Sequence, residues 1–200
     1  GGMNAMIVDS SALTEQVVVD VLASAFDSAG QRCSALRVLC LQDEIADHTL
    51  KMLRGAMAEC RMGNPGRLTT DIGPVIDSEA KANIERHIQT MRSKGRPVFQ
   101  AVRENSEDAR EWQSGTFVAP TLIELDDFAE LQKEVFGPVL HVVRYNRNQL
   151  PELIEQINAS GYGLTLGVHT RIDETIAQVT GSAHVGNLYV NRNMVGAVVG

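Results

Sequence analysis

The amino-acid sequence predicts an α/β fold in which helices pack on the faces of a parallel or mixed sheet. Two observations support this prediction. In the first sixty residues, short runs rich in β-branched and leucine side chains alternate with longer segments whose apolar residues recur at helical spacing. Hydrophobic residues make up 44% and charged residues 22% of the 200 residues, and these values are typical of a folded globular domain.

The first half of the chain is predicted to contain two strand–helix pairs, a long loop and a third helix. Strands are expected over residues 5–8 and 35–42, and helices up to Gly30, over residues 44–62 and over residues 78–93. Three glycines and two prolines between residues 63 and 77 argue against a helix or a central strand and predict a long ordered loop. The third helix is expected to begin at Ser78 as its N-cap and to end at Gly95.

The second half is predicted to consist of shorter elements that again alternate. Strands are expected over residues 97–102, 116–125, 139–146, 163–170 and 187–192, and helices over residues 150–160 and 173–182. A polar surface excursion is expected over residues 104–115. Neither an internal repeat nor a convincing linker is visible, so residues 1–200 are taken as one domain.

Charge and hydropathy argue against two classes of partner. The net charge is −7 with a pI near 5.2, and Lys and Arg are scattered, so no basic stretch is available for a nucleic-acid backbone. The apolar stretches are shorter than the roughly 20 residues that a membrane-spanning helix needs, and no signal peptide is visible. We therefore expect neither a nucleic acid nor a membrane as a partner.

The cysteines and histidines indicate a reducing compartment and no metal. Cys33, Cys40 and Cys60 form an odd set without Cys-x-x-Cys spacing, which favours the cytoplasm over a disulfide-forming compartment. None of the five histidines has a ligand-type partner at usable spacing, so no metal site is expected. Glycine-rich fingerprints for a dinucleotide or a phosphate are also absent from the chain.

Two side chains are candidates for chemistry on local grounds. Cys33 follows a helix-breaking glycine, stands beside Arg32 and lies where the chain enters a strand, so its thiol is a candidate nucleophile. The alternative is a small, inert, buried cysteine, which is the commoner role of a single cysteine. Glu134 comes just before a rigid Gly-Pro step and beside an aromatic residue, and its alternative is a solvated loop carboxylate.

Several motifs, taken together in order and spacing, resemble the aldehyde dehydrogenase superfamily. They are GGMN (residues 1–4), FDSAGQRC (26–33), GNPGRLTTDIGPVI (63–76), GTFVAPTL (115–122), EVFGPVL (134–140), GLTLGVHT (163–170) and NLYVNR (187–192). The resemblance covers the whole chain and implies the three-layer αβα catalytic domain of that fold, with a mostly parallel sheet. It also favours the nucleophile over the inert alternative for Cys33.

The resemblance implies an NAD-dependent reaction on a small aldehyde. In the family pattern, the thiolate at the position of Cys33 attacks the aldehyde, hydride passes to NAD, and water hydrolyses the resulting thioester. The backbone N–H of Cys33 would help to hold the oxyanion. Glu134 matches the glutamate that binds the nicotinamide ribose, and Phe136 matches the aromatic residue beside the nicotinamide.

Within the superfamily the chain is most similar to the glutamate semialdehyde (1-pyrroline-5-carboxylate) dehydrogenases, in particular to those that form the C-terminal enzyme of bifunctional proline-utilization proteins. The motifs GGMNAMIVDSSALTEQVV and VNRNMVGAVVG and the serine after the cysteine carry this similarity. In that branch, the substrate carboxylate is held by positions that match Ser34, Gly196 and Ala197. The implied reaction converts L-glutamate γ-semialdehyde to L-glutamate, the second step of proline catabolism.

Parts of the family pattern are missing from the chain. The general-base glutamate would fall just before Gly1, and the nucleotide-binding domain also lies upstream in the family. We therefore expect a catalytic domain truncated at both ends that neither binds NAD tightly nor turns over alone, and a homo-oligomer for the full-length protein. The alternatives are a fragment of an aldehyde dehydrogenase for another aldehyde, and a catalytically silent module used for assembly.

Overall fold

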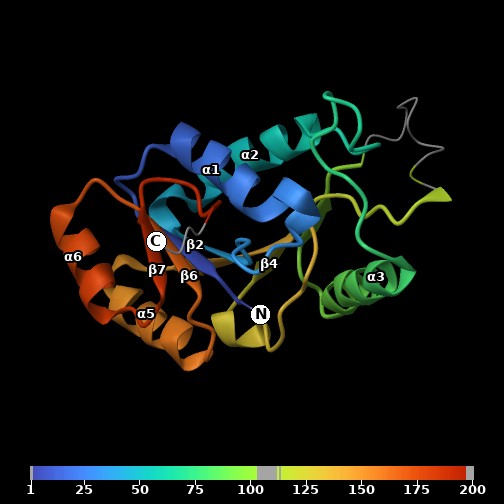
Figure 1. Cartoon of the computed structure of the whole chain (residues 1–200). Helices are drawn as coiled ribbons and strands as arrows, with labels where there is room; N and C mark the ends of the chain where they lie inside the picture. Colours follow the sequence, from blue (N-terminus) through green and yellow to red (C-terminus); the bar gives the residue numbers. More distant parts are fainter. Residues whose placement is uncertain (1, 103–111, 113, 197–200) are drawn as a thin grey trace.

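The computed structural model describes residues 2–102, 112 and 114–196, and seven strands in this part of the chain form one sheet in the order β3-β4-β5-β2-β1-β6-β7 (Figure 1). The strands are β1 (Ala5–Val8), β2 (Val38–Gln42), β3 (Val98–Gln100), β4 (Thr121–Leu125), β5 (Val139–Tyr145), β6 (Thr165–His169) and β7 (Asn187–Val190). Only the pairing of β3 with β4 is antiparallel. This mixed, mostly parallel sheet agrees with the fold class that the sequence predicts.

Helices cover both faces of the sheet. They are α1 (Thr14–Phe26), α2 (Asp43–Glu59), α3 (Ser78–Ser93), α5 (Leu150–Ala159) and α6 (Asp173–Ser182). Figure 1 shows α1 and α2 on one side of the sheet and α5 and α6 on the other. The strand order explains this division, because the chain moves one way along the sheet from β1 to β2 and the other way from β5 to β6 and β7. Right-handed crossovers then place the connecting helices on opposite faces.

The central strands form the core because both of their faces are covered. Every residue of β1, β2 and β6 is buried, whereas the edge strands β3 and β7 are half-buried along their whole length. Continuous burial is the pattern of a parallel strand between two helical layers. It explains why the sequence of β2 reads as an unbroken apolar run up to Gln42.

The predicted first helix is shorter than its apolar pattern indicates. It ends at Phe26 rather than Gly30, because the three residues Ser28, Ala29 and Gly30 have positive φ angles of 57°, 52° and 67°. An L-residue in this left-handed region costs about 1–2 kcal/mol, so the turn is locally unfavourable and is held by tertiary contacts. This turn leads directly to Cys33.

The predicted cap of α3 is also corrected. Asp77, not Ser78, is the N-cap residue, and its carboxylate accepts a hydrogen bond from the Ala80 N–H at 2.8 Å. Aspartate is as good an N-cap as serine, and the local sequence contains both. The end of the helix is as predicted, with Gly95 at φ +77° just after the last turn.

The predicted loop is ordered by contacts with a segment that the sequence assigns to a strand. The helix predicted over residues 44–62 ends at Glu59, and Met62 instead forms an isolated parallel bridge with Ile72 of the loop. The predicted strand over residues 116–125 begins only at Thr121, because Thr116 instead bonds to the loop. Its carbonyl accepts the Val75 N–H at 2.9 Å and its hydroxyl donates to the Val75 carbonyl at 2.6 Å. The loop and this segment therefore support each other.

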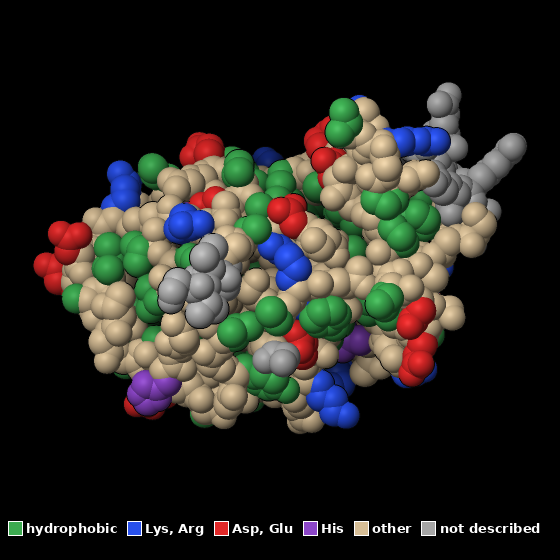
Figure 2. Space-filling model, viewed as in Figure 1, with side chains coloured by type: hydrophobic (Ala, Val, Ile, Leu, Met, Phe, Trp, Pro, Cys, Tyr) green, Lys and Arg blue, Asp and Glu red, His purple; other side chains and the backbone are tan. Residues whose placement is uncertain are grey.

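The surface shows no block of positive charge on the face seen in Figure 2. Lys and Arg side chains lie there as separate patches, interspersed with Asp, Glu and hydrophobic side chains. None of the helices among the described residues is both long and apolar enough to span a membrane.

Candidate active site at the amino edge of the sheet

The candidate site residues come together because they precede neighbouring parallel strands. Cys33 lies just before β2, and Glu134 and Phe136 lie just before β5, which pairs with β2 in parallel. The starts of parallel strands lie at the same edge of a sheet. The site therefore lies at the amino edge, whereas ligands of open α/β sheets usually bind at the carboxyl edge.

Cys33 is exposed in the middle of a tight turn. The Ala35 N–H donates to the Arg32 carbonyl at 3.1 Å, which closes the turn around Cys33 and Ser34. The backbone N–H groups of these two central residues have no acceptor among the described residues. The turn therefore presents a thiol together with unused backbone donors, which is an arrangement suited to binding an oxyanion.

Asn4, just before β1, holds this turn in place. Its side chain is buried, and its Nδ2 donates to the carbonyls of Cys33 and Ala35, both at 2.8 Å. Its Oδ1 accepts the N–H of Thr165, the first residue of β6, at 3.2 Å. The sequence reasoning assigned Asn4 no role, although a polar amide directly before a buried strand is a signal for such a contact.

Gly30 allows the turn before Cys33 to contact the segment before β5, and Gly137 allows that segment to pack against α3. A Cβ atom on Gly30 would lie 2.1 Å from the carbonyl oxygen of Gly137. A Cβ atom on Gly137 would lie 2.3 Å from Cδ1 of Ile84 on α3. Backbone atoms of two segments about a hundred residues apart are therefore in direct contact, and only glycine fits at either position without movement.

Arg37 is the most connected side chain of the site. It is 1% exposed, and its guanidinium donates to the carbonyls of Gly30, Arg32 and Gly137 and to the carboxylate of Glu134. Burial lowers the pKa of this guanidinium, and the negative charge of Glu134 acts in the opposite direction. The sequence reasoning missed Arg37, and the available signal was a charged residue within the apolar run ALRVLCLQ.

Glu134 and Phe136 both contact Arg37. The Glu134 side chain is 15% exposed and its Oε1 lies 3.3 Å from Arg37, so it differs from the solvated loop carboxylate of the alternative interpretation. The Phe136 ring is 45% exposed, and the Arg37 guanidinium carbon lies 5.1 Å from its centroid. The second oxygen of Glu134 has no hydrogen-bond partner among the described residues.

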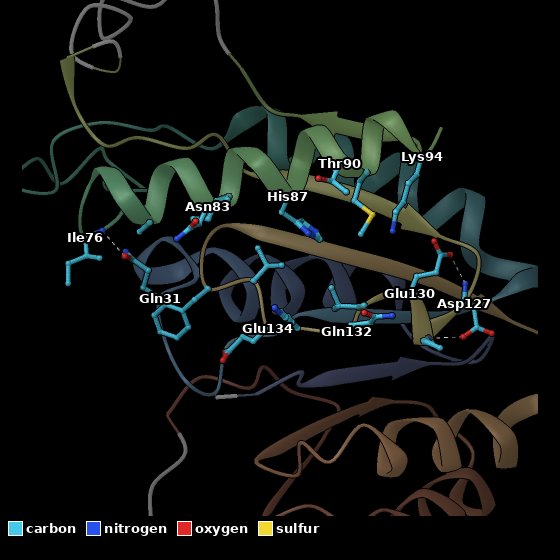
Figure 3. Close-up of a pocket in the computed structure, with 18 residues that line it drawn as sticks. Gln31, Ile76, Asn83, His87, Thr90, Lys94, Asp127, Glu130, Gln132 and Glu134 are labelled. Atoms are coloured by element: carbon cyan, nitrogen blue, oxygen red, sulfur yellow. Dashed lines mark hydrogen bonds between the residues drawn. The ribbon is translucent and has the colours of Figure 1, made fainter.

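A groove of about 870 Å³ extends from these residues between α3 and residues 127–136 (Figure 3). Asn83, His87 and Thr90 face the groove from the helix, and Glu134 lies on its opposite wall. A carboxylate oxygen with a free lone pair beside an exposed aromatic face is suited to a ribose and the flat ring attached to it. These residues therefore fit the nicotinamide half of the NAD that the family implies.

The predicted carboxylate-binding residues are only partly brought together. Ser34 is buried within the turn, and its hydroxyl has no hydrogen-bond partner among the described residues. Gly196 makes no hydrogen bond with Ser34 in the described part of the chain. Two residues before it, Met194 donates its N–H to Oγ of Ser24 on α1 at 2.9 Å. Ala197 lies outside the described residues.

Arg32, the neighbour of the thiol, has a structural role. Its guanidinium donates to the carbonyls of Ala23 and Ser24 at 2.9 and 3.2 Å. Both carbonyls belong to the last turn of α1, where a cation is favourable. The side chain therefore ties the turn to the helix.

A pair of histidines contacts the backbone of Arg37 through His141. The Nε2 atoms of His87 and His141 are 2.8 Å apart, and His141 Nδ1 lies 3.2 Å from the Arg37 carbonyl. Burial, with the neighbouring His87, lowers the pKa of His141 to about 3. His141 is therefore neutral, with Nδ1–H donating to the carbonyl and Nε2 accepting from His87. Among the described residues no group of three or more His, Cys, Asp or Glu is suited to a metal ion.

Comparison with known proteins identifies the class. The model of the aldehyde dehydrogenase family matches residues 1–200, and the chain belongs to this family. A crystal structure of a bifunctional proline utilization A (PutA) protein superposes on the whole chain with a TM-score of 0.91 at 48% identity. The betaine aldehyde dehydrogenase of Staphylococcus aureus superposes on 96% of the chain with a TM-score of 0.87 at 29% identity. The predicted family and fold class are confirmed.

The sequence relatives belong to the narrower group that the motifs predict. The chain is 94% identical over its whole length to the protein named bifunctional protein PutA of Salmonella typhimurium. It is 34% identical to 1-pyrroline-5-carboxylate dehydrogenase 1 of Halalkalibacterium halodurans. The chain spans 15% of the first of these relatives and 38% of the second.

Proposed function

We propose that the chain supplies the thiol-bearing part of an NAD-dependent dehydrogenase that oxidises L-glutamate γ-semialdehyde to L-glutamate. One observation carries this proposal. An exposed cysteine lies in a hydrogen-bonded turn with unused backbone donors, close to a carboxylate and an exposed aromatic ring that are suited to a nicotinamide ribose. The names of the relatives, which include 1-pyrroline-5-carboxylate dehydrogenases, support the choice of substrate.

Cys33 is the nucleophile of the proposed reaction. Its thiolate adds to the aldehyde carbon, and the carbonyl oxygen becomes an oxyanion that the Cys33 N–H binds. Once this carbon has lost its hydride, the same sulfur would hold the acyl group as a thioester until water releases it as a carboxylate. A backbone donor of this kind contributes about 3 kcal/mol to the lowering of an activation barrier. Asn4 fixes the turn and so keeps the thiol and the donor in one geometry.

Glu134 and Phe136 hold the cofactor in the proposed site. The free oxygen of Glu134 would accept a hydrogen bond from the ribose, and the exposed Phe136 ring would hold the nicotinamide end. When bound there, NAD supplies the acceptor for the hydride that leaves the substrate carbon. Ser34 contributes its hydroxyl to the substrate carboxylate, together with backbone N–H groups near Gly196 and Ala197.

An exchange of segments tests this function. Because the chain is 94% identical to the Salmonella relative, it can replace the matching 200 residues of that protein, whose other segments then supply the remaining domains. We expect NAD-dependent oxidation of glutamate semialdehyde with at least a tenfold preference over simple aldehydes, which corresponds to about 1.4 kcal/mol. A smaller preference would favour another aldehyde substrate, and an inactive exchange protein would favour an assembly module.

Variants of the exchange protein test the assigned residues. Cys33→Ala should abolish the reaction, whereas Cys60→Ala, at the end of α2 and outside the site, is the matched control. Ser34→Ala should raise KM for glutamate semialdehyde but not for an aldehyde without a carboxylate. An equal effect on both aldehydes would contradict the anchoring role.

The behaviour of the isolated chain is a separate part of the proposal. The 200 residues alone should neither retain NAD tightly nor produce NADH, and sustained NADH formation by them would contradict this. The thiol of Cys33 should still be the first to react with a mild alkylating agent, because it is exposed. Burial raises the pKa of the Cys40 thiol to about 12, so this cysteine should stay unmodified. A cytoplasmic location and a homo-oligomer stay predictions.

A further inference from the structure

Arg37 is a buried cation for which the proposed reaction gives no role. A buried ion pair is seldom needed for stability, because apolar side chains of similar size often stabilise a fold equally well. Arg37 nevertheless makes four hydrogen bonds, all to residues of the candidate site, while Leu36 and Val38 on either side of it are apolar. This concentration of contacts indicates a role in the site.

The contacts of the guanidinium divide evenly between two segments. Nη1 donates to the Gly30 carbonyl at 2.7 Å and to the Gly137 carbonyl at 3.2 Å. Nη2 donates to the Arg32 carbonyl at 3.1 Å and to Glu134 Oε1 at 3.3 Å. Each terminal nitrogen therefore joins the turn before the nucleophile to the segment that contains the proposed cofactor residues.

The backbone of Arg37 is itself fixed. Its N–H donates to the Asn4 carbonyl at 2.9 Å, and its carbonyl accepts both the N–H and the ring Nδ1 of His141 at 2.9 and 3.2 Å. The backbone is therefore anchored on both sides, while the four hydrogen bonds of the guanidinium fix the planar fork itself. Such a rigid fork transmits position in a way that a flexible ammonium group does not.

We propose that Arg37 is a positioning residue that locks residues 134–137 to residues 30–33, and so holds the cofactor-binding carboxylate at a fixed place relative to the thiol. This inference rests on the proposed function, which it deepens by naming the group that couples the two halves of the site. By occupying Oε1 of Glu134, Arg37 leaves Oε2 as the oxygen that would accept a hydrogen bond from the ribose.

The test compares Arg37→Lys with the same substitution at a second arginine, both made in the exchange protein. Lysine keeps the charge but has one terminal nitrogen, so it can replace at most one of the two links that Nη1 and Nη2 make between the segments. The control is Arg54→Lys, because Arg54 on α2 also forms an ion pair with a glutamate, Glu124, but lies outside the site. We expect KM for NAD to rise about tenfold in Arg37→Lys, with little change in KM for the aldehyde, whereas the control changes neither.

A double-mutant cycle shows whether Arg37 acts through Glu134. The variants Arg37→Lys and Glu134→Gln should each raise KM for NAD, and the double variant should be no worse than the worse single variant. Effects that multiply would mean that the two side chains act independently, and would overturn the proposal. A merely structural role would lower stability without this coupling.

Amide hydrogen exchange provides a readout that needs no activity. In Arg37→Lys, backbone amides of residues 134–137 should exchange about tenfold faster than in the parent protein, at equal global stability. If Arg37→Lys does not fold, Glu134→Gln takes its place, and exchange in residues 30–35 should rise. Unchanged exchange in both segments would overturn the proposal, whereas an inactive parent protein with the expected exchange would overturn only the proposed function.

Discussion

Replacing Gly30 with alanine is the sharpest test of how the candidate site is assembled. The residue has φ +67°, and a Cβ atom there would lie 2.1 Å from the Gly137 carbonyl oxygen and 2.9 Å from the Ala25 carbonyl oxygen. The clashing atoms belong to the backbone, so they cannot move aside as the end of a flexible side chain can. Gly30→Ala must therefore separate the two segments or distort the turn.

The expected cost has two parts. Alanine in the left-handed region costs about 1–2 kcal/mol. Overpacking of a closely packed site costs about 1–3 kcal/mol more. We therefore expect Gly30→Ala to lower the free energy of unfolding by about 2–5 kcal/mol. For a domain of this size, each kcal/mol lowers Tm by about 2–4 °C.

Gly95→Ala isolates the first part of this cost. Gly95 has φ +77°, and no heavy atom lies within 4 Å of the position of its Cβ. Its replacement should therefore cost only the conformational part, about 1–2 kcal/mol. Urea unfolding of the 200-residue chain, followed by circular dichroism, measures both variants under the same conditions. Equal losses for Gly30→Ala and Gly95→Ala would refute the close contact between Gly30 and Gly137.

Three further predictions concern other parts of the chain. Asn4→Ala leaves two carbonyls and one N–H without their partner, and should lower the free energy of unfolding by about 2–5 kcal/mol in urea and change the alkylation rate of Cys33. Gly55→Ala, at an open position within α2, should instead raise it by about 1 kcal/mol in the same assay, and a loss would contradict the exposed helical position. Because the pKa of His141 falls from 6.5 to about 3 on folding, the unfolded state binds more protons between these values. Stability should therefore fall on acidification below pH 6.5, by about 1.4 kcal/mol per pH unit from this group, and Tm measured from pH 7 to 5 should fall less steeply in His141→Gln than in the exposed control His48→Gln.

The elements with the strongest local patterns were predictable from the sequence. The first strand, over residues 5–8, and the helices over residues 78–93 and 173–182 have the predicted bounds. In each case periodicity and turn residues act within a few positions of one another. The end of α1 was not predictable in this way, because Ser28 and Ala29 adopt left-handed conformations that their own side chains disfavour.

The candidate site was predictable only in part, because some of its residues act through contacts with distant parts of the chain. Local features made Cys33 and Glu134 candidates, each with a plain alternative, and the motifs of the family then chose between them. Neither source pointed to Arg37 or Asn4. The roles of these two residues depend on long-range contacts with partners between 29 and 161 positions away, which hydropathy and turn chemistry do not encode.

Because the site lies where β2 and β5 begin, the pairing of these two strands sets its geometry. Val38 pairs with His141 between β2 and β5, and this pairing sets where Arg37 meets the segment before β5. A shift of one residue would move every side chain of a strand to the opposite face, and would remove the Arg37 carbonyl from the His141 ring and the guanidinium from Glu134. The hydrogen bond from the His141 N–H to the Arg37 carbonyl at 2.9 Å opposes such a shift. The core therefore does more than support the site from a distance, since its strand register determines the distance between the thiol and the proposed cofactor residues.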